Sequence, residues 1–171
     1  MGPATATVGY AAWTMDRQIS GFHQDERGDW VAELECGHDQ HVRHKPPWQS
    51  RPWVVTEAGR RAHLATTLPC VRCDRRELPA GARRRRVTRT FDHATMPDGL
   101  RAQHTTKRGV WAIIRVEAGT LVCRLYPPLA ARHELTAGAT LVLPPELPHE
   151  VEPVGEVRFA VEFLTGRPRG R

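Results

Sequence analysis

The chain lacks long apolar runs, a secretory leader and a cysteine framework. None of its 171 residues lies in a stretch approaching the roughly 20 apolar residues that cross a bilayer. The N-terminus also lacks the basic start and apolar core of a signal peptide. Of only four cysteines, three are spaced as metal ligands are, and Cys123 stands alone in an apolar run. These absences predict a soluble, cytoplasmic protein in a reducing compartment, with no membrane partner.

Lysine is nearly absent, and the excess positive charge is local. The net charge is +6, and Lys45 and Lys107 are the only two lysines. Residues 1–80 carry equal numbers of basic and acidic side chains, whereas residues 81–171 carry fifteen against nine, with five arginines between positions 83 and 89. So short a run is typical of a solvated linker or a first strand. We therefore expect no nucleic-acid partner, although a basic patch attracts phosphate unspecifically.

The most informative motif is Cys36-Gly37-His38 followed by Cys70-Val71-Arg72-Cys73. Each part places two ligand side chains in a tight turn, and the residues between them are numerous enough to fold back. Thiolates and an imidazole in this spacing favour a tetrahedral metal centre, and zinc is the metal we predict.

The fourth ligand is less well defined, because His41 and His44 follow His38 at intervals of three. Two prolines at 46 and 47 argue against one continuous helix carrying all three imidazoles. His38 is our first choice and His41 the alternative, while His44 is expected to bind a backbone or carboxylate partner. Three cysteines and one histidine would make a closed, structural site.

Composition divides the chain into a flexible lead at 1–16, a metal-binding module at 17–77 and a second domain at 78–167. In the module, residues 18–23 and 30–35 predict a hairpin around the turn at 25–29. Thr56 is expected to cap a short helix that runs to about residue 64. Trp48 and Trp53, with the prolines around them, are predicted to form the core of this module.

The second domain alternates apolar and polar residues in short segments that proline and glycine separate. Residues 109–116 and 120–126 predict one strand pair around a turn at 117–119, and residues 139–143 and 157–163 predict later strands. The fold class is therefore mainly β: a small metal-stapled α+β N-terminal module followed by an all-β barrel or sandwich.

The first half resembles a small bacterial domain family of unknown function. The resemblance covers residues 21–73 and includes Cys36-Gly37-His38, Pro46-Pro47-Trp48 and Arg51-Pro52-Trp53. It implies a compact metal-binding module and brings no activity with it.

The second half resembles the cupins. The segment from Gly138 to His149, with Pro144-Pro145 and Pro148-His149, is similar to the second cupin motif. Within the cupins, residues 78–165 resemble the TehB/YeaR-like domain of some tellurite-resistance methyltransferases, which implies a double-stranded β-helix barrel and a link to tellurite or nitrosative stress. No Gly-rich nucleotide loop follows the barrel, so methyl transfer is not expected.

A second metal site is predicted in the barrel from His104, His149 and Glu162. Two histidines and a carboxylate can hold a divalent metal while leaving positions open for substrate or oxygen.

Two function classes follow from these two predicted sites. One is a zinc-binding protein whose barrel takes a small-molecule or oxyanion ligand, and the other is a metal-dependent cupin enzyme, an oxygenase or isomerase acting on a small polar substrate. The sequence is silent on oligomeric state, although the resemblance is compatible with a homo-oligomer, since cupin-like barrels often pair through an edge strand.

Overall fold

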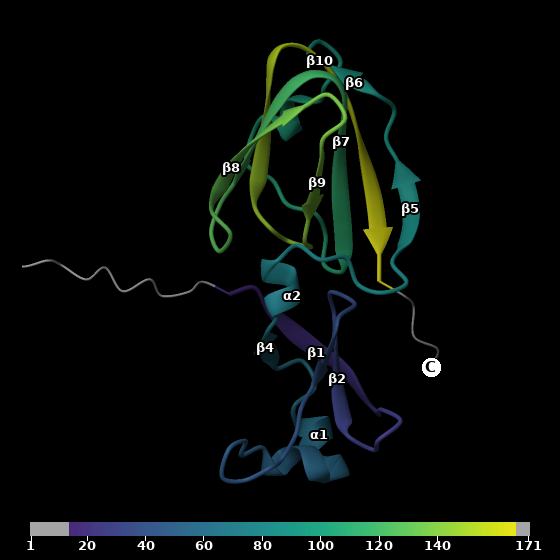
Figure 1. Cartoon of the computed structure of the whole chain (residues 1–171), viewed down its shortest axis with the longest axis vertical. Coiled ribbons are helices and arrows are strands. Elements are labelled where there is room, and N and C mark those ends of the chain that lie inside the picture. The colour runs from purple at the N-terminus through teal and green to yellow at the C-terminus, as the bar shows by residue number, and fades with distance from the viewer. Residues whose placement is uncertain (1–13, 167–171) are drawn as a thin grey trace, which may run out of the picture.

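The computed structural model describes residues 14–166 and shows a small module stacked against one end of a β-barrel (Figure 1). The module begins earlier than predicted. Met15 is buried and Asp16 already starts the first strand, so the last residues of the predicted lead are part of the fold. Residues 1–13 of that lead lie outside the described residues.

The module is built on one four-stranded antiparallel sheet. Its order is β3-β2-β1-β4. The strands are β1 (Asp16–Gln24), β2 (Trp30–Leu34), β3 (Asp39–His41) and β4 (Thr67–Pro69), and the helices are η1 (Pro52–Val55), α1 (Glu57–Ala62) and α2 (Val71–Asp74).

Local sequence explains the hairpin and the helix of this module, both as predicted. Strands β1 and β2 pair up to Gln24 and Trp30, and Gly28 takes a φ of 78° in the turn between them. Thr56 Oγ1 accepts a hydrogen bond of 3.0 Å from Gly59 N, which caps α1.

The predicted tryptophan core is half right. Trp53 packs against the core, stacking on His63 with ring centroids 3.9 Å apart. Trp48, in contrast, is 89% exposed, so its prediction as a core residue is wrong. The reason is local: Lys45 and Gln49 exchange backbone hydrogen bonds, and the tight loop between them carries Trp48 at its solvent side.

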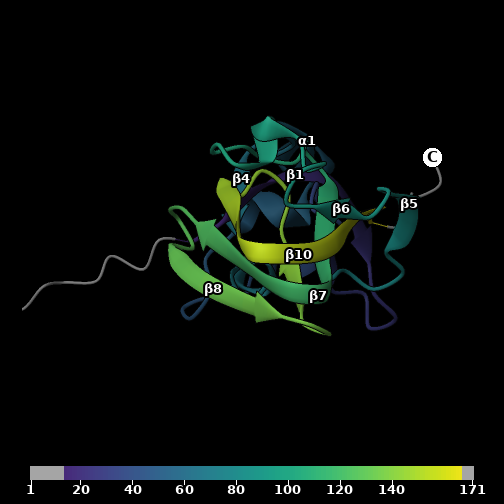
Figure 2. The ribbon, with the colours of Figure 1, turned by 90° about the horizontal axis from the view of Figure 1, so that it is seen from above.

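The barrel consists of one strongly curved sheet, seen from above in Figure 2. The strand order is β5-β10-β7-β8, with β6 added to β10 and β9 added to β7. The elements are β5 (Arg83–Val87), β6 (Phe91–Asp92), η2 (Asp98–Leu100), β7 (Val110–Leu125), β8 (Ala131–Thr136), β9 (Thr140–Leu143) and β10 (His149–Thr165). Of the two expectations for the arginine run, a solvated linker or a first strand, the second is right, because four of its five arginines lie in β5.

One strand prediction is wrong. The segments 109–116 and 120–126 do not pair with each other but form the single strand β7, and both of its arms pair with β10. Gly119 has a φ of 76°, and a Cβ there would lie 2.0 Å from Glu156 O. The turn signal at 117–119 therefore marks a bend that β7 and β10 make together, because glycine allows their backbones to touch.

The barrel core is filled from alternating positions of the long strands. Val157, Phe159 and Val161 of β10 are buried, as their spacing predicts. The largest fully buried side chains of the barrel are Trp111, Phe159, Leu121, Leu143 and Leu147. Between residues 14 and 166, no helix has the length and apolarity that crossing a membrane requires.

Candidate metal centre and barrel cavity

Four predicted ligands meet where the module touches the barrel. Cys36 follows β2, and His38 precedes β3 after a turn in which Gly37 has a φ of 92°. Cys70 is the N-cap of α2, and Cys73 lies within that helix. All four side chains are buried, and their ligand atoms lie within 4.8 Å of one another. The two short turns thus form one compact candidate metal site, with His38 as its fourth member.

Four of the six separations between these atoms are close to the edges of a tetrahedron, and the other two, between Cys73 Sγ and the remaining sulfurs, are within 4.8 Å. His38 Nδ1 lies 3.5 Å from Cys36 Sγ, 3.3 Å from Cys70 Sγ and 3.6 Å from Cys73 Sγ. Cys36 Sγ and Cys70 Sγ are 3.9 Å apart. Ligands at usual zinc–sulfur and zinc–nitrogen distances on a tetrahedron are separated by roughly 3.5–3.8 Å. The donor set and its spacing therefore fit a four-coordinate thiophilic cation.

The three thiols explain why a cation suits this site. Contacts with Cys70 and Cys73, together with burial, raise the pKa of the Cys36 thiol. Without a cation, neighbouring thiolates in a buried pocket repel one another, so all three cannot ionise together. A divalent metal reverses this, because it stabilises each thiolate that coordinates it.

Arg17 lies beside the thiols although it is only 3% exposed. Its Nε donates to Cys73 Sγ at 3.4 Å, and its other nitrogens reach Pro145 O at 2.6 Å and Glu146 Oε2 at 3.5 Å in the barrel. Three thiolates and a neutral imidazole around a dication would leave one net negative charge. The buried guanidinium, which also pairs with Glu146, would offset part of that charge, and its hydrogen bonds join the module to the barrel.

Trp111 of β7 makes the second contact between the site and the barrel. Its Nε1–H donates to Cys36 O at 2.8 Å, and its ring meets the His38 imidazole edge to face, with centroids 5.4 Å apart. Beside this contact Gly37 lies so close to Gly166 that a Cβ on Gly37 would approach the Gly166 Cα to 2.9 Å. The site is thus enclosed by both halves of the chain.

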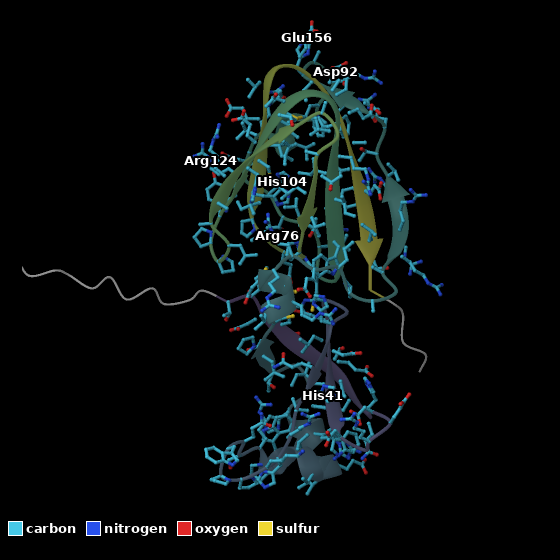
Figure 3. All side chains as sticks on the ribbon, in the orientation of Figure 1. His41, Arg76, Asp92, His104, Arg124 and Glu156 are labelled. Atoms are coloured by element: carbon cyan, nitrogen blue, oxygen red, sulfur yellow. The ribbon has the colours of Figure 1, made fainter. Side chains whose placement is uncertain are left out.

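The alternative ligand His41 is not at this site. Its Nε2 pairs with Asp25 Oδ2 at 2.9 Å near the far end of the module, away from Arg76 at the junction (Figure 3). His41 as a ligand is therefore wrong, because β3 pairs with β2 in a register that places this side chain beside the hairpin turn. His44 Nδ1 accepts from Arg51 N at 3.0 Å, a backbone partner of the expected kind.

The barrel brings together two of the three residues predicted for a second site. His104 and His149 form a backbone bridge, their ring centroids are 4.2 Å apart, and both line a cavity of about 220 Å³. Figure 3 shows His104 inside the barrel. Glu162 is not with them: it lies between two cavity-lining residues on β10, faces the other side of the strand and forms an ion pair with Arg115. The predicted set of three is therefore wrong in its carboxylate.

Both cavity histidines have a fixed tautomer. His104 Nδ1 lies 2.9 Å from Ala102 O, and His149 Nδ1 lies 2.8 Å from Leu147 O. A carbonyl oxygen only accepts, so each Nδ1 carries a proton, and the neutral form of each ring presents an unprotonated Nε2. Burial lowers the pKa of His149 to about 4, and His104 beside it acts in the same direction.

We predict that this depressed pKa makes stability fall in mild acid. An exposed histidine titrates near 6.5, so on acidification the unfolded chain takes up a proton at position 149 before the folded chain does. The resulting loss in the free energy of unfolding is negligible above pH 7, grows as the pH falls from 6.5 to 4, and stays constant below pH 4. Between pH 7 and pH 5 it amounts to about 2 kcal/mol. Urea unfolding at both pH values measures it, and His149→Asn, which keeps the hydrogen-bond donor, should lose less stability than the wild type by that amount.

Equal losses in the two proteins would show that the imidazole does not carry this effect. The comparison is between variants because acid also protonates the metal ligands in both proteins.

Arg17, Trp111 and Arg86 are site residues that sequence reasoning did not find. Arg17 and Trp111 act on the metal site from strands distant in the sequence, and Arg86 lines the barrel cavity. Two signals were present in the sequence: Arg86 belongs to the arginine run at 83–89, and Trp111 lies within residues 78–165, which resemble the TehB/YeaR-like domain. Neither signal identified a site residue.

Comparisons with known proteins divide the chain in the same way. Residues 20–77 match the family model described as "Protein of unknown function (DUF3565)", and residues 86–161 match the model of the TehB-like domain. No curated protein shows significant similarity to the sequence.

Solved structures match the barrel half. A crystal structure of an E. coli protein is 24% identical with a TM-score of 0.50, and the match covers 54% of this chain and 98% of that one. TehB from Haemophilus influenzae is 19% identical with a TM-score of 0.47, over 50% of this chain and 32% of its own. A cupin-2 domain protein from Shewanella frigidimarina is 20% identical with a TM-score of 0.32, over 40% of this chain and 59% of its own.

At these identities the solved structures concern the fold, and the matched segment spans about a third of TehB. The two family models together account for the module with the Cys/His cluster and for the barrel with the histidine pair. The chain therefore joins a DUF3565 module at residues 20–77 to a TehB-like domain at residues 86–161.

Proposed function

We propose that this protein is a zinc-stabilised, two-domain ligand-binding protein. In this proposal Cys36, Cys70 and Cys73 as thiolates and His38 through Nδ1 hold a structural zinc ion, and the cupin-like barrel takes a small-molecule or oxyanion ligand. The tetrahedral spacing of four buried ligand atoms carries the proposal. Bound zinc would supply folding energy to a module that has a small apolar core of its own.

A structural role fits better than a hydrolytic one. The protein supplies all four ligands, and a catalytic zinc needs one position for water or substrate. Arg17 and Trp111 also fill the space around the site, so a substrate would have to displace the junction between the domains.

The proposed setting is a response to tellurite or nitrosative stress in the cytoplasm. It is supported by the match of residues 86–161 to the TehB-like domain. A cupin-like barrel can bind a toxic oxyanion or a signalling molecule, and we assign it no chemical step.

The alternative, a metal-dependent cupin enzyme, has less support. Of its three predicted ligands for a second divalent metal, only His104 and His149 meet, because Arg115 holds Glu162 on the other face of β10. An oxygenase or isomerase built on that set is therefore not proposed.

Metal analysis of the full chain tests the zinc site. The protein, purified without added metal, should contain one zinc ion per chain by inductively coupled plasma mass spectrometry. His38→Ala should lose most of it. His41→Ala, which removes the exposed histidine three residues later, should keep all of it.

Two results would contradict the proposal. One is a folded wild-type chain that contains no zinc, and the other is equal zinc content in the two histidine variants.

A further inference from the structure

The barrel cavity has an unusual polar inventory for its size. Most of its wall is apolar, and no carboxylate is among its lining residues. Its polar groups are Arg86, the histidine pair and the hydroxyls of Thr88, Thr105 and Thr106. A wall of this kind suits a molecule with an apolar body and a few polar groups at fixed places.

The histidine pair offers hydrogen-bond acceptors to a ligand in the cavity. Each Nδ1–H is committed to a backbone carbonyl, which leaves each Nε2 as an acceptor. His149 is only 4% exposed as a residue, yet its Nε2 is not one of the fully buried unpaired polar atoms of residues 14–166, so this acceptor is open to the cavity that His149 lines. A ligand that brings an O–H group to it forms a hydrogen bond inside a largely apolar cavity and so gains affinity.

Arg86 provides a positive charge that can bind an anionic group of a ligand. It belongs to an exposed strand that presents four consecutive arginines, and Arg89 follows shortly after. Among the described residues, none of these five arginines forms an ion pair with a carboxylate. Strand β5 flanks the C-terminal arm of β10, whereas His149 begins the N-terminal arm. The two polar groups therefore come to the cavity from different arms of the barrel.

We propose that the barrel cavity binds a small hydroxylated organic acid, with its anionic group at Arg86, its apolar body against the Phe159 and Val161 wall, and its hydroxyl donating to the Nε2 of His149. This inference rests on the proposed ligand-binding role and names its substrate class. A bare inorganic oxyanion fits less well, because the apolar wall would leave most of its oxygens without donors.

The cavity volume limits the size of the ligand. About 220 Å³ is below the range of drug-sized pockets, so a single ring with two substituents is an appropriate probe. We choose 4-hydroxybenzoate, which has both polar groups, and compare it with benzoate, 4-hydroxybenzamide and tellurite. Each comparison changes one part of the proposed recognition.

The binding test uses the zinc-containing full chain and isothermal titration calorimetry. We expect 4-hydroxybenzoate to bind about tenfold more tightly than either benzoate or 4-hydroxybenzamide, since each lacks one polar contact. An amide that binds as tightly as the acid would overturn the anion assignment. Tellurite binding more tightly than 4-hydroxybenzoate, or no binding by any probe, would overturn the inference as a whole.

Variants locate the binding. Arg86→Gln should weaken 4-hydroxybenzoate about tenfold, whereas Arg84→Gln, which removes the same charge from the same strand outside the cavity lining, should have little effect. His149→Phe should reduce the affinity for 4-hydroxybenzoate to that for benzoate and leave the affinity for benzoate unchanged. Equal effects of the two arginine variants would mean that only long-range charge attracts the ligand, and would overturn the site.

Zinc content separates this inference from the function on which it rests. A chain that keeps its zinc and binds only neutral probes would leave the ligand-binding role standing and overturn the hydroxy acid. A chain without zinc that binds 4-hydroxybenzoate in the stated order would overturn the zinc proposal and support the cavity assignment.

Discussion

Replacing Cys70 by serine is expected to unfold the N-terminal module while the barrel stays folded. The change removes one of four ligands from a site whose metal-binding energy is part of the folding energy of the module. We expect the module to lose at least about 3 kcal/mol of its free energy of unfolding. Serine is a good N-cap residue, so helix α2 itself should not suffer from the substitution at its cap.

Calorimetry of the full chain measures this effect. The variant should show a weak, low-temperature unfolding transition for the module, or none, and a separate transition at higher temperature for the barrel. Its zinc content should be lower than that of the wild type.

The matched control for this experiment is Cys123→Ser. Cys123 is also a buried free thiol, but it lies in β7 of the barrel, where burial raises its pKa to about 12. It contacts no metal ligand, so zinc content should stay at the wild-type value. If both variants kept their zinc and the module unfolded as in the wild type, the cluster would be a set of packed thiols rather than a metal site.

The cluster of candidate metal ligands could be predicted from sequence because the geometry of each pair is local. Cys36 and His38 flank a glycine that has to take a positive φ, and Cys70 and Cys73 belong to one short turn of helix. Only the meeting of the two turns depends on the rest of the fold. His41 could be rejected only from the pairing of β3 with β2, because spacing alone places it as well as His38.

The errors in the barrel come from long-range pairing. The turn signal at 117–119 is the same whether the chain reverses or merely bends there, and the close approach of Glu156 decides between the two. Glu162 was predicted as a ligand inside the barrel, but it lies on the opposite face of β10, where it forms an ion pair with Arg115 of the neighbouring strand. Alternation in one strand cannot show which residue of another strand will pair with it.

The position of the metal site suggests why the two domains occur in one chain. Arg17 connects Cys73 Sγ to Pro145 O, and the next residue, Glu146, donates its backbone N–H to Thr106 Oγ1 at 3.2 Å. Thr106 lines the barrel cavity. The candidate metal site and the barrel cavity are therefore connected by a series of hydrogen bonds, and the buried side chain of Arg17 links the two domains within it.

Arg17→Met is expected to be the most damaging substitution outside the metal ligands. Methionine has a similar length but no charge, so the net negative charge of the metal centre and the Pro145 carbonyl would both lose a buried partner. Removing one member of a buried, charge-compensated set costs about 3–5 kcal/mol. Urea unfolding should show this loss, and a chelator should remove zinc faster from the variant, because the domain junction opens more readily.

Arg124→Met is the control, since it makes the same substitution at an ion pair on the barrel surface. Arg124 is 52% exposed and pairs with Glu150, so its loss should cost less than about 1 kcal/mol. Zinc release should not change in this variant. If Arg17→Met behaved like Arg124→Met in both measurements, the Arg17 guanidinium would only fill space at the domain junction and would not stabilise it electrostatically. The residual charge of the metal site would then have to be screened by water rather than by the protein.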